Sequence, residues 1–268
     1  MSNKPPAFVG SVPEKYERYL GSYLFEPYAK DLVRRIRRAD IRTVLEIACG
    51  TGRVTSHLRK TLLPDAHLTA TDLNADMIAI AREVVPAKDI EWAVADALEL
   101  PFEDGRFDLV VCQFGLMFVP DKDRALSEVY RVLKPGGQVL LNTWDKLENN
   151  PAFFLADQIV SGYFPEEPPL FFHVPFSLHD EKELALLFER AGFKNCRISL
   201  VKMMGRNDSA MDTATGMMEG TPIYSTINER DPELLPVIKK ELERQLGERF
   251  GKAPIVSAMQ AWVVEGEK

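Results

Sequence analysis

The chain has 268 residues, the size of one large domain or of one domain with a substantial insertion. Apolar residues make up 46% and charged residues 27%, so a disordered chain, a collagen-like repeat and a coiled coil are excluded. The formal net charge of −7 does not suit the phosphate-neutralising surface of a nucleic-acid-binding protein.

Signals for targeting, disulfides and metals are absent from the sequence. No window of about 18 apolar residues occurs, so no transmembrane helix is predicted. The N-terminus, Met1–Pro6, lacks the apolar segment of a secretory signal. Cys49, Cys112 and Cys196 form no Cys-x-x-Cys pair and the four histidines are dispersed, so neither a disulfide framework nor a metal site is predicted. We therefore expect a cytoplasmic protein without a bound metal, and a homodimer is left open.

The first half of the chain alternates between short apolar runs and helical stripes. The runs are rich in Val, Ile, Leu and Thr and predict strands at 43–47, 67–72, 90–96, 107–113 and 138–144. Stripes at helical spacing lie at 28–36, 77–85 and 126–133. Asn74 is the expected N-cap of the second stripe, and Lys134–Gly137 is expected to turn the chain into the fifth strand. This alternation predicts a parallel α/β sheet with ligands at the carboxyl ends of its strands.

The second half follows a different pattern. Helices are expected at 151–164, 184–191 and 235–250, and strands at 193–201 and 255–264. Gly192 and Gly251 are the expected caps after the second and third of these helices. The segment 203–222 has no assigned element, and its methionines suit an adaptable apolar pocket and a core equally well.

A glycine-containing turn follows the first predicted strand. That strand ends near Glu46, and Gly50 and Gly52 then let the backbone bend sharply and approach a ligand. A dinucleotide fingerprint needs a third glycine, where this chain has Thr55. The Glu46 carboxylate would repel a pyrophosphate and attract an ammonium group. The pattern therefore favours a cofactor that carries an amino acid over NAD.

The other strand ends carry further polar and aromatic groups. Asp72 ends the second strand and suits the two hydroxyls of a ribose. The pair Asp96–Ala97 ends the third strand, where a carboxylate and a backbone N–H can read the amine and ring nitrogen of adenine. Gln113, Phe114 and Phe118 follow the fourth strand and are expected over the middle of the cleft.

Five segments of the first half occur in an order and spacing known from one family. They are VLEIACGTG (44–52), TATDLNADMI (69–78), VADALELPF (94–102), FDLVVCQFGLMFVPD (107–121) and RVLKPGG (131–137). Together they resemble the class I S-adenosylmethionine (SAM)-dependent methyltransferases, in particular the ubiquinone and menaquinone C-methyltransferase group. The resemblance implies a three-layer, Rossmann-like α/β fold. Its sheet would be mostly parallel and seven-stranded, with an antiparallel last strand and helical lid and insertion elements.

By this resemblance the cofactor is SAM and its product S-adenosylhomocysteine (SAH). The positions that match the family's cofactor site are Glu46, Ala48, Cys49, Gly50, Thr51, Gly52, Asp72, Leu73, Met77, Asp96, Ala97, Gln113, Phe114 and Phe118. By the same resemblance, Glu46 and Ala48–Gly52 would hold the methionine part and Asp72 the ribose. Leu73, Met77, Asp96 and Ala97 would surround adenine, and Gln113, Phe114 and Phe118 would close the sulfonium end. The family more often has Asp at the position of Glu46 and Gly at the position of Ala48.

The N-terminal segment is aromatic-rich, and in similar enzymes such a segment covers the cofactor. Tyr16, Tyr19 and Phe25 are the candidates here, with plain packing as the alternative. The expected division of the chain is 1–40 (helical lid), 41–145 (SAM-binding core), 146–205 (helix-rich segment and sixth strand), 206–253 (helical insertion forming part of the substrate pocket) and 254–268 (final strand).

The expected reaction is direct, in-line methyl transfer from SAM to a small molecule. The aromatic and Met-rich second half predicts a hydrophobic or aromatic acceptor. His173 and Tyr224 are the candidates for a general base, although a lone His among apolar residues is more often structural. The alternatives are a nucleotide-dependent Rossmann oxidoreductase and a non-catalytic SAM-binding protein. A nucleic acid is not expected as a partner.

Overall fold

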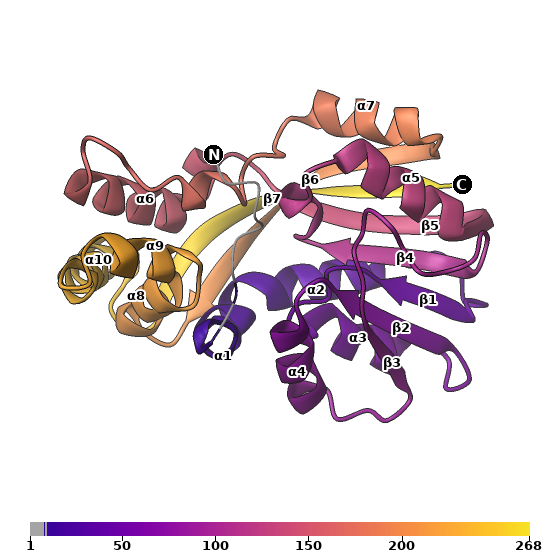
Figure 1. Ribbon diagram of the computed structural model, residues 1–268, viewed down its shortest axis with the longest axis horizontal. Coiled ribbons are helices and arrows are strands. Elements are labelled where there is room, and N and C mark those ends of the chain that lie inside the picture. The colour runs from indigo at the N-terminus through magenta and orange to yellow at the C-terminus, as the bar shows by residue number, and fades with distance from the viewer. Residues whose placement is uncertain (1–7, 9) are drawn as a thin grey trace.

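Seven strands form one sheet in the order β3-β2-β1-β4-β5-β7-β6, as the computed structural model shows for residue 8 and residues 10–268 (Figure 1). The strands are β1 (Thr43–Glu46), β2 (His67–Asp72), β3 (Ile90–Val94), β4 (Phe107–Gln113), β5 (Leu133–Trp144), β6 (Lys194–Asn207) and β7 (Ile255–Glu267). Neighbouring strands from β3 to β5 pair in parallel, and β7 runs antiparallel to both β5 and β6. This topology confirms the predicted Rossmann-like methyltransferase fold.

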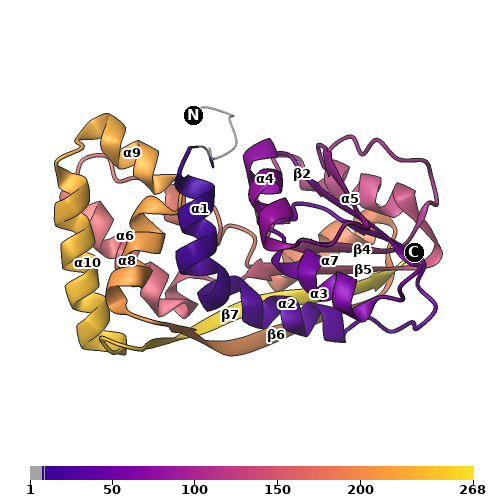
Figure 2. The same cartoon turned by 90° about the horizontal axis from the view of Figure 1, so that it is seen from below.

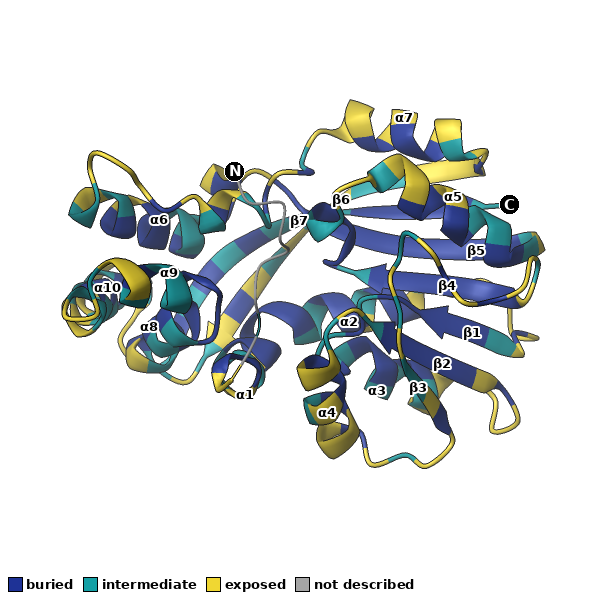
Figure 3. Cartoon of the chain, viewed as in Figure 1, coloured by how far each residue is buried: buried dark blue, intermediate teal, exposed yellow. Residues whose placement is uncertain are grey.

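The central strands are buried on both faces because their apolar residues alternate between two cores. In β1, Val44 belongs to one apolar cluster and Leu45 to the other, and Leu109 and Val110 of β4 divide in the same way. The helices α2 (Glu26–Arg34), α3 (Arg53–Thr61) and α4 (Ala75–Val84) cover one face, and α5 (Lys122–Val132) and α7 (Glu181–Ala191) cover the other. Of the strands between these layers, β1 and β4 are almost entirely buried, whereas β3 at the edge is partly exposed (Figure 3).

Most helix boundaries lie where the sequence predicts them. The Asn74 side chain accepts a hydrogen bond from the Asp76 N–H at 2.8 Å and caps α4, as expected. Gly192 has a left-handed φ of 95° after α7. The first stripe was predicted too long, because α2 ends at Arg34. The next residue, Arg35, forms an ion pair with Glu265 of β7.

The predicted turn at Lys134–Gly137 is wrong. These residues lie inside β5, which already pairs with β4 at Leu133 and pairs again from Gln138 onward. The extra residues form an irregularity in the ladder, where Gly136 adopts a φ of 74°. The Gly136 N–H donates to the backbone carbonyl of Lys268, so the end of the chain holds this segment in the sheet.

Four helices gather beyond the extended ends of β6 and β7, and we call them the helical lobe (Figure 1). They are α6 (Pro151–Tyr163), α8 (Ala210–Glu219), α9 (Ile223–Arg230) and α10 (Leu234–Phe250). β6 continues to Asn207, past the predicted end, so the expected division between residues 205 and 206 falls inside a strand. Of the methionines at 203–222, Met217 and Met218 are fully buried, whereas Met204 and Met211 are exposed.

The N-terminal arm consists of α1 (Val12–Tyr16), the π-helix η1 (Glu17–Phe25) and α2. α1 packs against both α4 of the core and α8 of the lobe, so it lies across the space between them (Figure 2). Asn207 of β6 donates its side-chain N–H to the Tyr19 carbonyl at 2.9 Å, which ties the arm to the sheet. Residues 1–7 and 9, where the expected lid segment and the Met1–Pro6 stretch begin, lie outside the described residues.

Cys49 and Cys112 are buried, and all three cysteines of the described chain are free. Within the described residues no helix has the length and apolar character needed to cross a membrane. No group of three or more His, Cys, Asp or Glu side chains there could hold a metal ion.

Candidate active site

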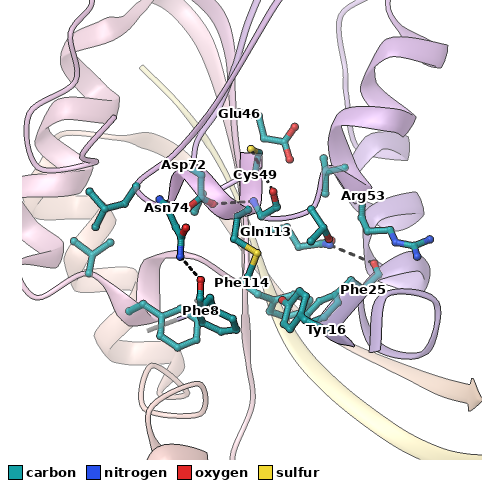
Figure 4. A pocket seen from close by; sticks show the side chains of 18 of the residues that line it. Phe8, Tyr16, Phe25, Glu46, Cys49, Arg53, Asp72, Asn74, Gln113 and Phe114 are labelled. Atoms are coloured by element: carbon teal, nitrogen blue, oxygen red, sulfur yellow. Dashed lines mark hydrogen bonds between the residues drawn. The ribbon is translucent and has the colours of Figure 1, made fainter. Parts of the chain in front are cut away.

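A cavity of about 820 Å³ lies at the carboxyl ends of β1, β2 and β4. Polar side chains occupy one end of it and aromatic side chains the other (Figure 4). The structure brings together most of the positions expected to hold the cofactor: Glu46, Ala48, Cys49, Gly50, Thr51, Asp72, Leu73, Met77, Asp96, Gln113, Phe114 and Phe118 all line this cavity.

The glycine turn needs a left-handed backbone at three positions. Gly50 and Gly52 have φ values of 54° and 83°, and Ala48 adopts 52° although it carries a Cβ. Such a conformation is uncommon outside glycine. Room for the Ala48 side chain comes from Gly115, where an added Cβ would lie only 2.4 Å from the Cβ of Ala48. A glycine after β4 therefore makes room for the left-handed alanine after β1.

Glu46 is buried at the end of β1 without a cationic partner among the described residues. It is 1% exposed, and its Oε2 accepts a hydrogen bond from the Thr55 hydroxyl at 2.6 Å. Burial raises the pKa of Glu46 to about 8; the Thr55 hydrogen bond opposes this rise and the nearby Asp72 adds to it. A cationic ligand group would relieve this desolvation, which is the property expected of an ammonium-binding carboxylate.

Asp72 connects two parts of the cofactor end. Its Oδ2 accepts the Gly50 N–H at 2.8 Å, and its Oδ1 accepts the Asn74 N–H at 2.9 Å. Burial raises the pKa of Asp72, and these backbone hydrogen bonds lower it. The carboxylate thus holds the glycine turn against the start of α4. Asp96, beyond β3, is exposed and accepts the Leu98 N–H at 2.9 Å.

Gln113 at the end of β4 contributes an unpaired polar atom. Its Nε2 donates to the Phe25 carbonyl of the N-terminal arm at 3.3 Å. Its Oε1 is buried and has no hydrogen-bond partner among the described residues. A buried acceptor without a partner is costly, so a ligand donor at this place would stabilise the site.

The aromatic end is built mainly from the N-terminal arm. Tyr16 stacks on Phe25 with ring centroids 4.8 Å apart, and Phe8 meets Tyr16 edge-on at 5.4 Å. Phe118, from the short helix η2 (Leu116–Phe118), faces Phe8 at 6.5 Å. Burial raises the pKa of the Tyr16 hydroxyl well above its ordinary value, with smaller contributions from nearby acids. Tyr16 is therefore neutral near pH 7.

Phe114 links this end to the fold behind it. Its ring stacks on Trp144 at 3.9 Å, and its backbone has a φ of 50°. The Asn142 side chain accepts the Phe114 N–H at 3.0 Å, which holds that unusual conformation. Asn142 and Trp144 are both buried and support Phe114 without lining the cavity.

Some expected site residues lie elsewhere. Gly52 packs beneath α4, where a Cβ would meet Val85 at 3.0 Å. Ala97 and Tyr19 do not line the cavity, and the aromatic residue of α1 that does is Tyr16. The two candidates for a general base are also outside the lining, namely His173 and Tyr224.

His173 contacts an acid of the helical lobe and not the cavity. Its Nε2 lies 3.3 Å from Oδ1 of Asp157 in α6, and its side chain is 56% exposed. Tyr224 lies in α9 with the Lys15 ammonium 5.9 Å from its ring centre. The catalytic roles assigned to both residues stay predictions.

Several lining residues were not expected from the sequence. They are Phe8, Arg53, Val54, Asn74, Ala75, Leu98, Val119, Pro120 and Val174. Arg53 directly follows Gly52 in the sequence, and this position could have predicted that it lines the cavity. Asn74 was read only as a helix cap, although its Nδ2 also donates to the Phe8 carbonyl at 2.6 Å. Val174 comes from a distant loop and left no signal in the sequence.

Comparison with known proteins agrees with this geometry. Residues 45–141 match the model of the methyltransferase domain family. Demethylmenaquinone methyltransferase of Staphylococcus aureus is 32% identical over 207 residues, covering 70% of this chain and 84% of that protein.

Solved structures share the fold at low sequence identity. Phosphoethanolamine N-methyltransferase 2 of Haemonchus contortus, bound to phosphomonomethylethanolamine and SAH, is 19% identical with a TM-score of 0.61, covering 96% of this chain and 56% of that one. A SAM-dependent methyltransferase of Aquifex aeolicus is 21% identical with a TM-score of 0.50, covering 70% and 89%.

The glycine turn, the acids at the strand ends and the sequence relatives lead to one assignment. The buried Glu46 and the unpaired Gln113 oxygen suit an ammonium group, and the cavity is large enough for a nucleoside with an amino-acid tail. The cofactor is SAM, and this chain belongs to the class I SAM-dependent methyltransferases.

Proposed function

We propose that this enzyme methylates a small, planar, apolar molecule, such as an aromatic or quinone-like ring. The observation that carries the proposal is the aromatic end of the cavity, which Phe8, Tyr16, Phe25 and Phe118 line. Aromatic side chains bind a flat apolar ligand by burying its apolar surface. Each contact between two rings adds about 0.5–1.5 kcal/mol. The quinone-related name of the S. aureus relative supports the same class of acceptor.

The cofactor residues of the proposal are those that the strand ends present. Glu46 and Gln113 would bind the ammonium group, and the backbone of Ala48–Thr51 would follow the methionine part. Asp72 would bind the ribose, and Met77 with Asp96 would enclose adenine. When bound, SAM supplies a methyl group on a positively charged sulfur, which makes that carbon electrophilic.

The remaining work of the chain is to align the acceptor and to exclude water. Alignment contributes roughly 7–11 kcal/mol in well-oriented systems. The arm covers the aromatic end, where Phe25, Phe114 and Leu116 are buried. The acids that line the cavity lie at its cofactor end. An acceptor that already presents an electron-rich carbon or an ionised oxygen suits such a surface, because it needs no base beside it.

His173 stays a candidate base only if the loop between α6 and α7 that carries it moves toward the acceptor. His173→Ala is the direct test, since loss of a general base lowers turnover by about 10²–10⁴-fold and leaves cofactor affinity unchanged. Unchanged turnover in the variant would assign His173 to a structural contact with Asp157.

The test of the proposed function has two stages. First, thermal unfolding is measured with SAH and, separately, with NADH; a ligand at about 100 times its Kd stabilises by roughly 2.7 kcal/mol. We expect a shift with SAH alone, and a shift with NADH alone would contradict the cofactor assignment. Second, transfer of labelled methyl groups from SAM is measured on phenols, hydroxynaphthoquinols and matched polar amines of equal size. Transfer to the amines alone would overturn the acceptor class, and tight SAH binding without transfer to any of them would favour a non-catalytic SAM-binding protein.

A further inference from the structure

Arg53 joins the glycine turn to the N-terminal arm. It is the first residue of α3, directly after the left-handed Gly52, and it lines the cavity. Its guanidinium forms an ion pair with Glu17 of η1, in which Nη2 and Nε donate to the two carboxylate oxygens. The Thr51 hydroxyl donates to the same carboxylate at 2.6 Å. Glu17 therefore holds two residues of the cofactor loop at once.

The arm is shaped to receive this guanidinium. η1 is a π-helix of nine residues, and π-helical turns are rare and frequently lie at functional sites. Gly21 of this helix lies against Arg53, and a Cβ there would be 2.5 Å from Nη2 and 2.9 Å from the Glu17 carboxylate. Any side chain at position 21 would displace the ion pair. Glu26 completes the surroundings, with Oε2 3.5 Å from Nη1.

Charge on the cavity wall is distributed unevenly. Within the described part of the chain, Arg53 is the only Lys or Arg side chain on the lining, whereas Glu46, Asp72 and Asp96 are acids. A guanidinium has five N–H donors, and Glu17 accepts hydrogen bonds from two N–H groups. The amino-acid end of SAM carries a carboxylate beside its ammonium group. The acids can bind the ammonium group but repel the carboxylate, so a cation is needed near them.

We infer that Arg53 recognises the α-carboxylate of the cofactor with the N–H donors that make no hydrogen bond to Glu17, in competition with the ion pair to Glu26. Glu17 is then a positioning residue, because it fixes the planar guanidinium whose fork geometry matches a carboxylate. The Arg53 side chain then contacts both the arm and the amino-acid end of the cofactor. The contact of the arm with the cofactor loop is therefore most stable when the bound cofactor has its carboxylate. This inference concerns the cofactor and is independent of the proposed acceptor.

The test compares two ligands that differ only in the carboxylate. Kd values of SAH and of decarboxylated SAH are measured by calorimetry for the wild type, Arg53→Gln and Arg53→Lys. We expect the wild type to prefer SAH by roughly 10- to 100-fold, the range of a charge-assisted hydrogen bond. Arg53→Gln loses most of this preference and binds decarboxylated SAH as the wild type does. Arg53→Lys keeps part of the preference, because lysine keeps the positive charge but lacks the planar arrangement of N–H donors that a guanidinium has.

Two outcomes would overturn the inference. The first is equal affinity of the wild type for the two ligands, which needs no variant and so cannot result from misfolding. The second is an Arg53→Gln protein that retains the full preference for SAH, whether its affinity for both ligands is unchanged or weakened equally. Arg18→Gln is the matched control, since Arg18 is an exposed arginine of the same π-helix that does not line the cavity, and its preference should equal that of the wild type.

Glu17 is tested by the rate at which the ligand leaves. Glu17→Gln keeps a hydrogen-bond acceptor for Thr51 but removes the ion pair with Arg53. We expect SAH to dissociate several-fold faster from this variant, while decarboxylated SAH dissociates at the wild-type rate, because only the first uses the guanidinium. Glu14→Gln, an exposed position of α1, is the control. Equal acceleration for both ligands would assign Glu17 to holding the arm alone.

Discussion

At the cofactor end of the cavity the polar groups follow the strands of one sheet, whereas the aromatic end is assembled from segments far apart in the chain. Glu46, Asp72 and Gln113 are the last residues of β1, β2 and β4. Phe8 and Val174, by contrast, reach the same cavity from the stretch before α1 and from the loop after α6. The first end is fixed by sheet topology, and the second depends on how separate segments pack.

This difference separates two kinds of specificity. Strand ends hold backbone and side chains rigidly, so the polar end can recognise one cofactor through fixed hydrogen bonds. The aromatic end makes few hydrogen bonds, and its shape follows from contacts such as the one between Phe8 and Tyr16. Substitutions at the polar end should therefore change cofactor binding, and substitutions at the aromatic end should change the choice of acceptor.

The largest effect is expected for Asp72→Ala. The change removes the acceptor for the Gly50 and Asn74 N–H groups as well as the proposed contact with the ribose. The two ribose hydroxyls would each donate a hydrogen bond to this carboxylate. A hydrogen bond to a charged group is worth roughly 1.5–3 kcal/mol, so the Kd of SAH should rise about 100-fold or more. Calorimetry measures it, with the exposed Asp76→Ala on α4 as the control. An unchanged Kd would contradict the assignment of Asp72 to the ribose.

Gly115→Ala should damage the same end through the fold. Its Cβ would lie 2.4 Å from the Ala48 Cβ and 2.8 Å from the Cys112 sulfur, so the glycine turn must shift. Overpacking of this kind costs about 1–3 kcal/mol of unfolding free energy, measured by urea denaturation. Gly162→Ala in α6 is the matched control: nothing lies within 4 Å of that Cβ, so helix propensity alone acts and should stabilise by about 0.5–1 kcal/mol. Equal effects of the two changes would show that the crowding at Gly115 is unimportant.

Glu46 should make the ligand-free protein less stable as the pH rises. Its pKa is about 8 in the fold, raised by burial, against 4.5 without perturbation. Between these values the unfolded chain loses the proton and the folded chain keeps it. The unfolding free energy therefore falls with rising pH, by at most about 1.4 kcal/mol per pH unit.

Glu46→Gln should remove that slope and weaken SAH binding at the same time. Urea denaturation at several pH values between 5 and 8 measures the first effect, and calorimetry measures the second. Glu14→Gln on the exposed side of α1 should leave the slope unchanged. A wild-type slope that persists in Glu46→Gln would assign the titration to another group.

The smallest effect is expected at the aromatic end. Phe118→Ala removes one wall and its contact with Phe8. Aromatic pairs are worth about 0.5–1.5 kcal/mol, so the KM of an aromatic acceptor should rise roughly 2- to 12-fold while the Kd of SAH changes little. Leu170→Ala is the control, since Leu170 is 55% exposed and does not line the cavity. A larger change in the Kd of SAH than in the KM of the acceptor would place Phe118 at the cofactor.

Sequence reasoning reached the core of the fold and most of the cofactor end because both are local. Each strand of the core is a short apolar run, and each polar residue sits where such a run ends, so position along the chain translates directly into position in the cavity. The errors had a shared cause. Lys134–Gly137 belong to β5, where Gly136 and Gly137 bond to the backbone of Lys268, and beyond the end of α2 Arg35 pairs with Glu265 of β7. Both partners are distant in sequence.

By itself the sequence determined the parallel sheet and the glycine turn with its acids, because strand periodicity and strand-end residues are local features of the chain. It determined the cofactor through the resemblance of these segments to the methyltransferase family. Only the tertiary structure decided that Tyr16 and not Tyr19 faces the cavity, since a π-helix of the arm shifts which residues share a face. It also decided that Gly115 makes room for Ala48 and that Glu17 holds Arg53. These relations depend on which surfaces meet when the arm and the core pack together, and no local pattern encodes that contact.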